Sequence, residues 1–114
     1  MMQNPGIVSS GLPVVVSGVV STKTALTASS PTFATVGVTS ASAVASNANR
    51  KGLILVNTSA NIIYLGLAAT AVIGSGITIY PQGVFEMDEY TFTTGAVNAI
   101  ASAASSNLTI QEFI

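Results

Sequence analysis

Charged side chains are scarce in this chain. Its 114 residues include 3 Lys or Arg and 4 Asp or Glu, 6% in all, whereas about 25% of a typical soluble domain is charged. Intrinsic disorder combines low hydrophobicity with high charge, and this composition is the reverse, with 49% hydrophobic residues and a mean hydropathy of +0.67. Because three cations neutralise few phosphates, we expect no nucleic-acid partner.

Cysteine, histidine and tryptophan are absent. Zinc sites, haem sites and disulfide frameworks lose their main ligands without Cys and His, so we expect no metal and no cofactor. A serine nucleophile would have no histidine base. The cluster 86–90 leaves one chemical alternative, a carboxylate pair formed by Glu86 and Asp88 for acid–base work or Ca²⁺ binding. A solvated strand end is the preferred interpretation, and we expect no catalytic residue and no enzyme.

No stretch of the chain is long and apolar enough to predict a membrane span. The longest nearly uncharged apolar stretch, 62–73, contains Gly66 and Thr70 and ends at the Gly-Ser-Gly of 74–76. A spanning helix needs about 18 or more predominantly apolar residues. The N-terminus carries no basic region typical of a signal peptide. We therefore expect neither membrane insertion nor secretion.

The composition changes near residue 50. Residues 1–49 contain a single charge, Lys23, and are rich in Ser, Thr, Ala, Val and Gly, whereas the other charges lie beyond them. We therefore divide the chain into an N-terminal arm with a connecting segment, 1–49, and a β-sandwich body, 50–113.

The body contains short strand-prone runs separated by turn residues. Branched and aromatic residues favour strands, and Gly, Pro, Asn and Ser favour the turns between them. The predicted strands are 52–57, 62–66, 76–80, 84–87, 96–101 and 108–113. This spacing predicts an all-β fold, an antiparallel β-sandwich or jelly-roll-like body with an extended N-terminal arm.

Two pairs of these runs are predicted to form hairpins. The runs 52–57 and 62–66 flank a Thr-Ser-Ala-Asn turn. The runs 76–80 and 84–87 flank Pro81-Gln82-Gly83, whose proline and glycine positions fit a type I turn.

The stretches 53–56 and 62–65 are apolar on both faces. One face of an antiparallel sheet is usually solvated, so these stretches predict cover on both sides. The second cover can come from the arm, from a loop at 67–73, or from another subunit.

We predict an interface with neighbouring copies, as a trimer or higher homo-oligomer. The basic pair Arg50-Lys51 could dock on an acidic patch, although a charged pair that protects an aggregation-prone strand is the simpler interpretation. Tyrosines on strands could anchor an interface or pack locally. The interface candidates are Ile7, Leu12, Val14, Val16, Phe33, Arg50, Lys51, Ile62, Tyr64 and Val72.

A run of motifs in the body resembles a known pattern. The motifs are Ala48–Ser59, Ile63–Gly66, Gly74–Ile77, Pro81–Gly83 with Phe85-Glu86, Ala96–Ile100 and Leu108–Ile110. The pattern over residues 48–113 is similar to that of small bacteriophage virion structural proteins of the head-decoration type. Gln82 stands where the family usually has a second glycine or serine.

The resemblance implies a structural virion protein, assembled in the host cytoplasm, whose partners are its own copies and the major capsid protein or another virion protein. The leading expectation is a capsid decoration or cement protein. The alternative is a tail, collar or fibre component that presents a host-recognition surface, for which the loop 86–94 is the candidate.

Overall fold

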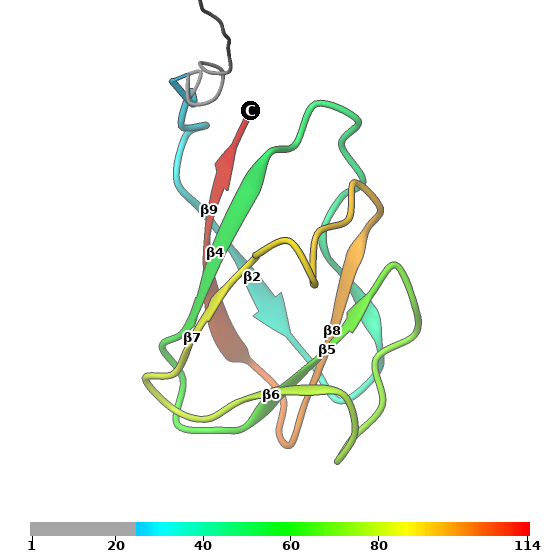
Figure 1. Ribbon diagram of the computed structural model, residues 1–114. Coiled ribbons are helices and arrows are strands. Elements are labelled where there is room, and N and C mark those ends of the chain that lie inside the picture. The colour runs from blue at the N-terminus through cyan, green and yellow to red at the C-terminus, as the bar shows by residue number, and fades with distance from the viewer. Residues whose placement is uncertain (1–24) are drawn as a thin grey trace, which may run out of the picture.

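The computed structural model describes residues 25–114, which form two four-stranded antiparallel sheets (Figure 1). The strands are β2 (Thr32–Val36), β3 (Ala41–Val44), β4 (Gly52–Asn57), β5 (Ile63–Leu67), β6 (Ile77–Ile79), β7 (Val84–Glu86), β8 (Val97–Ala101) and β9 (Ser106–Phe113). One sheet has the order β2-β9-β4-β7 and the other β3-β8-β5-β6. The expected all-β antiparallel sandwich is confirmed.

The strand pairs are nested around the loop between β5 and β6. β5 pairs with β6, β4 with β7, β3 with β8 and β2 with β9, all antiparallel. Apart from the one between β5 and β6, each connection between consecutive described strands crosses from one sheet to the other. The described chain is thus one long hairpin rolled into two layers, which is the jelly-roll arrangement.

The predicted strands are confirmed, but both predicted hairpins are wrong. β4 and β5 lie in different sheets, and so do β6 and β7. A polar cluster explains why the chain crosses after β4: the buried Asn57 donates from Nδ2 to the carbonyl oxygens of Asn61 (2.7 Å) and Ile79 (2.8 Å). Its Oδ1 accepts hydrogen bonds from the backbone and hydroxyl of Ser59. A turn composition alone cannot distinguish such a corner from a hairpin.

The turn at residues 80–83 also differs from the expectation. The Gly83 amide donates to the Tyr80 carbonyl at 2.7 Å, which closes a β-turn. Gln82 has a φ of 67°, and a positive φ at the third position belongs to type II rather than type I. Pro81 suits the second position of either type, so the proline and glycine positions did not separate them.

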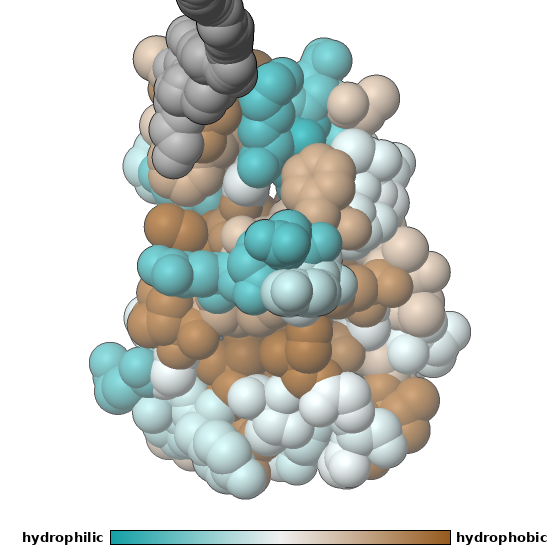
Figure 2. All heavy atoms as spheres, viewed as in Figure 1, coloured by the Kyte–Doolittle hydropathy of each residue, from teal (hydrophilic) through white to brown (hydrophobic). Residues whose placement is uncertain are grey.

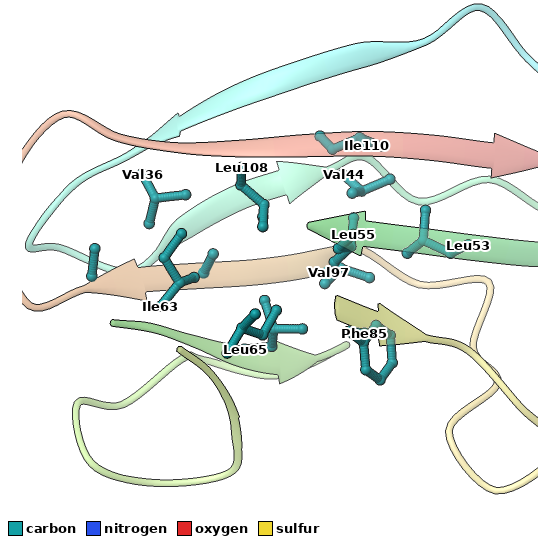
Figure 3. Packing of buried hydrophobic residues seen from close by; sticks show 13 residues of the cluster. Val36, Val44, Leu53, Leu55, Ile63, Leu65, Phe85, Val97, Leu108 and Ile110 are labelled. Carbon is teal, nitrogen blue, oxygen red and sulfur yellow. The ribbon is translucent and has the colours of Figure 1, made fainter. Parts of the chain in front are cut away.

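The core lies between the inner faces of the two sheets (Figure 3). β4 alternates strictly, with Leu53 and Leu55 buried and Ile54 and Val56 half-buried on the outer face. The buried cluster comprises Val36, Val44, Leu53, Leu55, Ile63, Leu65, Ile79, Phe85, Val97, Ala99, Ala101, Leu108 and Ile110. All eight described strands contribute to it, so the core ties both layers together.

The two sheets extend N-terminally beyond the boundary expected at residue 50. β2 and β3 form one edge of each sheet. The chain before β2 also follows β9, because Thr27 and Ile114 exchange two backbone hydrogen bonds of 2.9 Å. Pro31 directly precedes β2, and proline is tolerated at the start of an edge strand because it has no backbone N–H to donate to the sheet.

The loop expected at 67–73 is present, with Leu67 as the last residue of β5. It folds over the outer face of β3-β8-β5-β6, where Asn98 Nδ2 donates to the Ala69 carbonyl (2.6 Å) and the Ala71 amide donates to Ser40 Oγ (2.9 Å). Ala71 is buried there. This loop supplies one of the three covers proposed for the two-faced apolar stretches, and it does so on the sheet of β5 and not on that of β4. Within residues 25–114, no helix is long and apolar enough to cross a membrane.

Gly66 is the position at which this loop comes closest to the sheet. A Cβ on Gly66 would overlap the Ala69 carbonyl oxygen and lie 2.8 Å from the Ala71 amide nitrogen. We expect Gly66→Ala to lower the free energy of unfolding by about 2 kcal/mol, because backbone atoms must move. Gly37 has no atom within 4 Å of its Cβ position, so Gly37→Ala is the matched control. Equal stability of the two variants in urea denaturation would contradict this packing.

Candidate interface

The outer face of the sheet β2-β9-β4-β7 carries apolar side chains on three of its four strands, with the polar Thr109 of β9 among them. The strand registers place Phe33, Thr109, Val56 and Val84 side by side across the four strands. Phe33 is 67% exposed and Val84 58% exposed. Ile54 lies in the neighbouring row, between Gln111 and Glu86. We call Phe33, Ile54, Val56 and Val84 the open face.

Hydrophobic surface is visible where the two short edge strands approach one another. Figure 2 shows it as brown surface over the region in which Figure 1 places β6 and β7. Val84 on β7 and Tyr80 directly after β6 are both exposed there. A contiguous apolar patch on a small domain commonly marks a contact with another molecule.

The loop that lies on the other sheet borders an open hollow of about 290 Å³. It lies between β5, β6 and the loop that joins them. Its lining residues are Leu65, Gly66, Leu67, Ala69, Thr70, Val72, Ser75, Gly76 and Ile77, none of them charged. Its volume is slightly below the range of about 300–1,000 Å³ that is usual for small-molecule pockets.

Arg50 makes the main side-chain hydrogen bonds at one end of the sandwich. At this end, the beginning and the end of the described chain lie next to each other. The Arg50 side chain is fully buried, and Nε donates to Glu112 Oε2 at 2.7 Å. Nη1 donates to the carbonyl oxygens of Thr93 and Gly95, both at 2.8 Å. Nη2 donates to the Ala45 carbonyl at 2.7 Å. One guanidinium thus joins β9, the β3–β4 loop and the β7–β8 loop.

This placement differs from the interpretation of Arg50 as a docking or protecting surface charge, since a buried guanidinium is not available to a partner. Lys51, its neighbour, is exposed. The sequence did contain a signal: Glu112 has the same parity as the core residues Leu108 and Ile110. A carboxylate on a core-facing position requires a buried partner.

Arg50 is expected to stabilise the fold strongly. Arg50→Met leaves the Glu112 carboxylate and three carbonyl oxygens without their donors, so we expect a loss of about 3 kcal/mol in the free energy of unfolding. Lys51→Met, the adjacent exposed position, should change it by no more than about 0.5 kcal/mol. Chemical denaturation of both variants measures the difference, and similar values for the two would show that the guanidinium network contributes little.

The β7–β8 loop, residues 87–96, presents aromatic side chains to solvent. Tyr90 is 89% exposed and Phe92 is about half exposed. Asp88 braces the loop: its Oδ1 accepts hydrogen bonds from the amides of Tyr90 (2.9 Å) and Thr91 (3.0 Å) and from the Thr91 hydroxyl (3.1 Å). With Arg50 bound to the far end of the loop, both ends are held.

These hydrogen bonds lower the pKa of Asp88 below its ordinary value of 3.8, first through the Tyr90 amide and then through the Thr91 hydroxyl. A lowered pKa in the folded state means that the turn is stabilised above the ordinary value and loses this stabilisation as the pH falls through the lower folded value. We expect the amide resonances of Tyr90 and Thr91 to titrate with a midpoint below 3.8, and this transition to vanish in Asp88→Ala. A midpoint at or above 3.8 would refute the proposed brace.

The predicted interface residues fall into three groups. Ile7, Leu12, Val14 and Val16 lie outside the described residues. Phe33, Lys51 and Val72 are exposed, and Ile62 and Tyr64 are half-buried. Arg50 is buried. The structure therefore places Phe33 on the open face and Val72 at the hollow, whereas Tyr64 lies beside Ile100 and Thr78 on the other sheet.

The two carboxylates considered for catalysis, Glu86 and Asp88, lie in different surroundings. Glu86 points outward from β7, whereas Asp88 binds its own loop. Among residues 25–114, no group of three or more Asp, Glu, His or Cys side chains could hold a metal ion.

Comparison of the chain with family models, with curated proteins and with solved structures finds no match.

Proposed function

We propose that this chain is a bacteriophage virion structural protein, a decoration or cement protein that stabilises the head through apolar contacts between β modules. The observation that carries the proposal is the open face, where β2, β4 and β7 present exposed or half-buried apolar side chains within the described part of the chain. The jelly-roll fold and the resemblance of residues 48–113 to small virion proteins support it.

The contact energy in this proposal comes from burial of apolar surface. Burial contributes about 25 cal/mol per Å² before the entropic costs of association. The partners are other copies of the chain, as a trimer or higher oligomer, and the major capsid protein. Residues 25–114 contain one ion pair, Arg50–Glu112, and it is internal. Contacts of this kind depend little on salt, because screening weakens charge interactions and not apolar burial.

The test uses phage particles prepared without the chain, to which the purified protein is added back. We expect the bound protein to survive a wash in about 1 M NaCl, at which the Debye length is only about 3 Å. Measured by quantitative gel or mass spectrometry, the retained fraction should match that after a low-salt wash. Release of the protein by salt would show ionic contacts and overturn the proposal.

A second candidate function is a tail, collar or fibre component that recognises the host. The observation that favours it is the braced loop with Tyr90 almost fully exposed, since rigid aromatic side chains are frequent anchors in recognition surfaces. Copy number per particle separates the two functions. By symmetry, a shell position implies on the order of hundreds of copies and a tail position roughly six to eighteen.

A further inference from the structure

The open face lacks a cover within the described residues, and the chain itself contains a suitable one. We propose that residues 12–20 of a second copy pack on the open face as an apolar strap. The inference deepens the proposed function, because it rests on the self-association assumed there and names the segment and surface that mediate it.

The two outer faces of the sandwich differ in their cover. The loop after β5 covers part of the outer face of β3-β8-β5-β6, with Ala71 buried against it. No corresponding loop of residues 25–114 covers the open face, and Phe33 and Val84 remain exposed at its two edges. Burial of this row therefore needs chain from elsewhere.

The part of the chain before residue 25 joins the body at the sheet that carries the open face. Thr27 is hydrogen bonded to Ile114, and Ala28 forms a bridge with Phe113 at the end of β9. Twenty-four residues precede the described part. Such a length of chain spans at most roughly 80 Å, which is enough to reach an adjacent molecule.

The chemistry of residues 12–20 matches that of the open face. Their sequence, LPVVVSGVV, contains no charge, and Leu12, Val14 and Val16 would share one side of an extended segment. The only charge in residues 1–24 is Lys23. On the other side, the open face is bordered by Glu86, followed by Asp88 and Glu89. An uncharged segment followed by a cation is therefore complementary to an apolar row bordered by carboxylates.

The link between this segment and the body favours a second copy over the same chain. To cover its own open face, the chain would have to reverse direction within residues 21–26. That stretch, STKTAL, contains one residue that is frequent in turns, Ser21, and no Gly, Pro, Asn or Asp. Thr27 and Ala28 pair with the end of β9, and a chain that continued from there in an extended form would pass beyond this end and could reach a neighbour.

The absence of cysteine allows a direct test on the full-length chain. Val16→Cys and Val84→Cys are prepared as separate proteins, mixed without particles and oxidised. We expect a disulfide-linked heterodimer as the main product. Thr78→Cys, exposed on the outer side of β6 in the other sheet, is the control and should give little heterodimer with Val16→Cys.

Two outcomes would overturn the inference. One is the absence of the Val16–Val84 heterodimer beyond the level of the Thr78 control. The other uses a chain that carries both Val16→Cys and Val84→Cys. If this chain forms an intramolecular disulfide and the mixed single variants give no heterodimer, the segment packs on its own chain. Because this test uses no particles, its failure leaves the salt-wash result of the proposed function intact, and the reverse also holds.

A pair of surface variants provides a second measurement. Val84→Lys places a charge on the open face, whereas Val38→Lys places one at a site of nearly equal exposure, 60% against 58%, in the β2–β3 loop. By light scattering, we expect Val84→Lys to shift the oligomer toward monomer and Val38→Lys to keep the wild-type mass. An unchanged mass for Val84→Lys would contradict the strap.

Discussion

The Arg50 guanidinium is the interaction on which one whole end of the sandwich depends. It binds the Glu112 carboxylate and three backbone carbonyl oxygens from two loops, so three separate segments converge on one planar group. Burying an ion pair is favourable only when nearly every polar atom has a partner. Each guanidinium nitrogen of Arg50 has an acceptor here. Two of these acceptors are carbonyl oxygens of the β7–β8 loop, so the same hydrogen bonds hold the loop that carries Tyr90.

An uncharged polar side chain, that of Asn57, holds the opposite end of the sandwich. Asn57 is buried, and its amide joins the turn after β4 to the end of β6. Between the two ends lies an entirely apolar core. The chain therefore buries Asn57 and one of its few charged side chains, Arg50, at corners where strands cross between sheets, and leaves apolar side chains on the outer surface of β2-β9-β4-β7. This distribution suits a module that works in contact with others.

The sequence predicted the strands of the body because branched residues and turn residues alternate clearly there. It did not predict their pairing, since the turn at Thr58–Asn61 looks the same whether it closes a hairpin or crosses between sheets. Asn57, which holds the crossing between the sheets, is of a residue type that is common in turns, but it acts through its hydrogen bond to the Ile79 carbonyl. The role of Arg50 was missed for a similar reason: its partner Glu112 is 62 residues away. Phe33 was predicted from its apolarity alone, whereas the row to which it belongs emerges only from the registers.

The nested pairing has a consequence for how the polypeptide is made. β2 binds β9, so residues near 33 find their partners near 109 only after β9 has been synthesised. Among the described strands, only β5 and β6 are both successive in the chain and paired, and the other nested pairs join strands that lie further apart in the sequence. Until β9 has been synthesised, β2 lacks its partner, and nascent chains on one polysome can meet while this strand is still free.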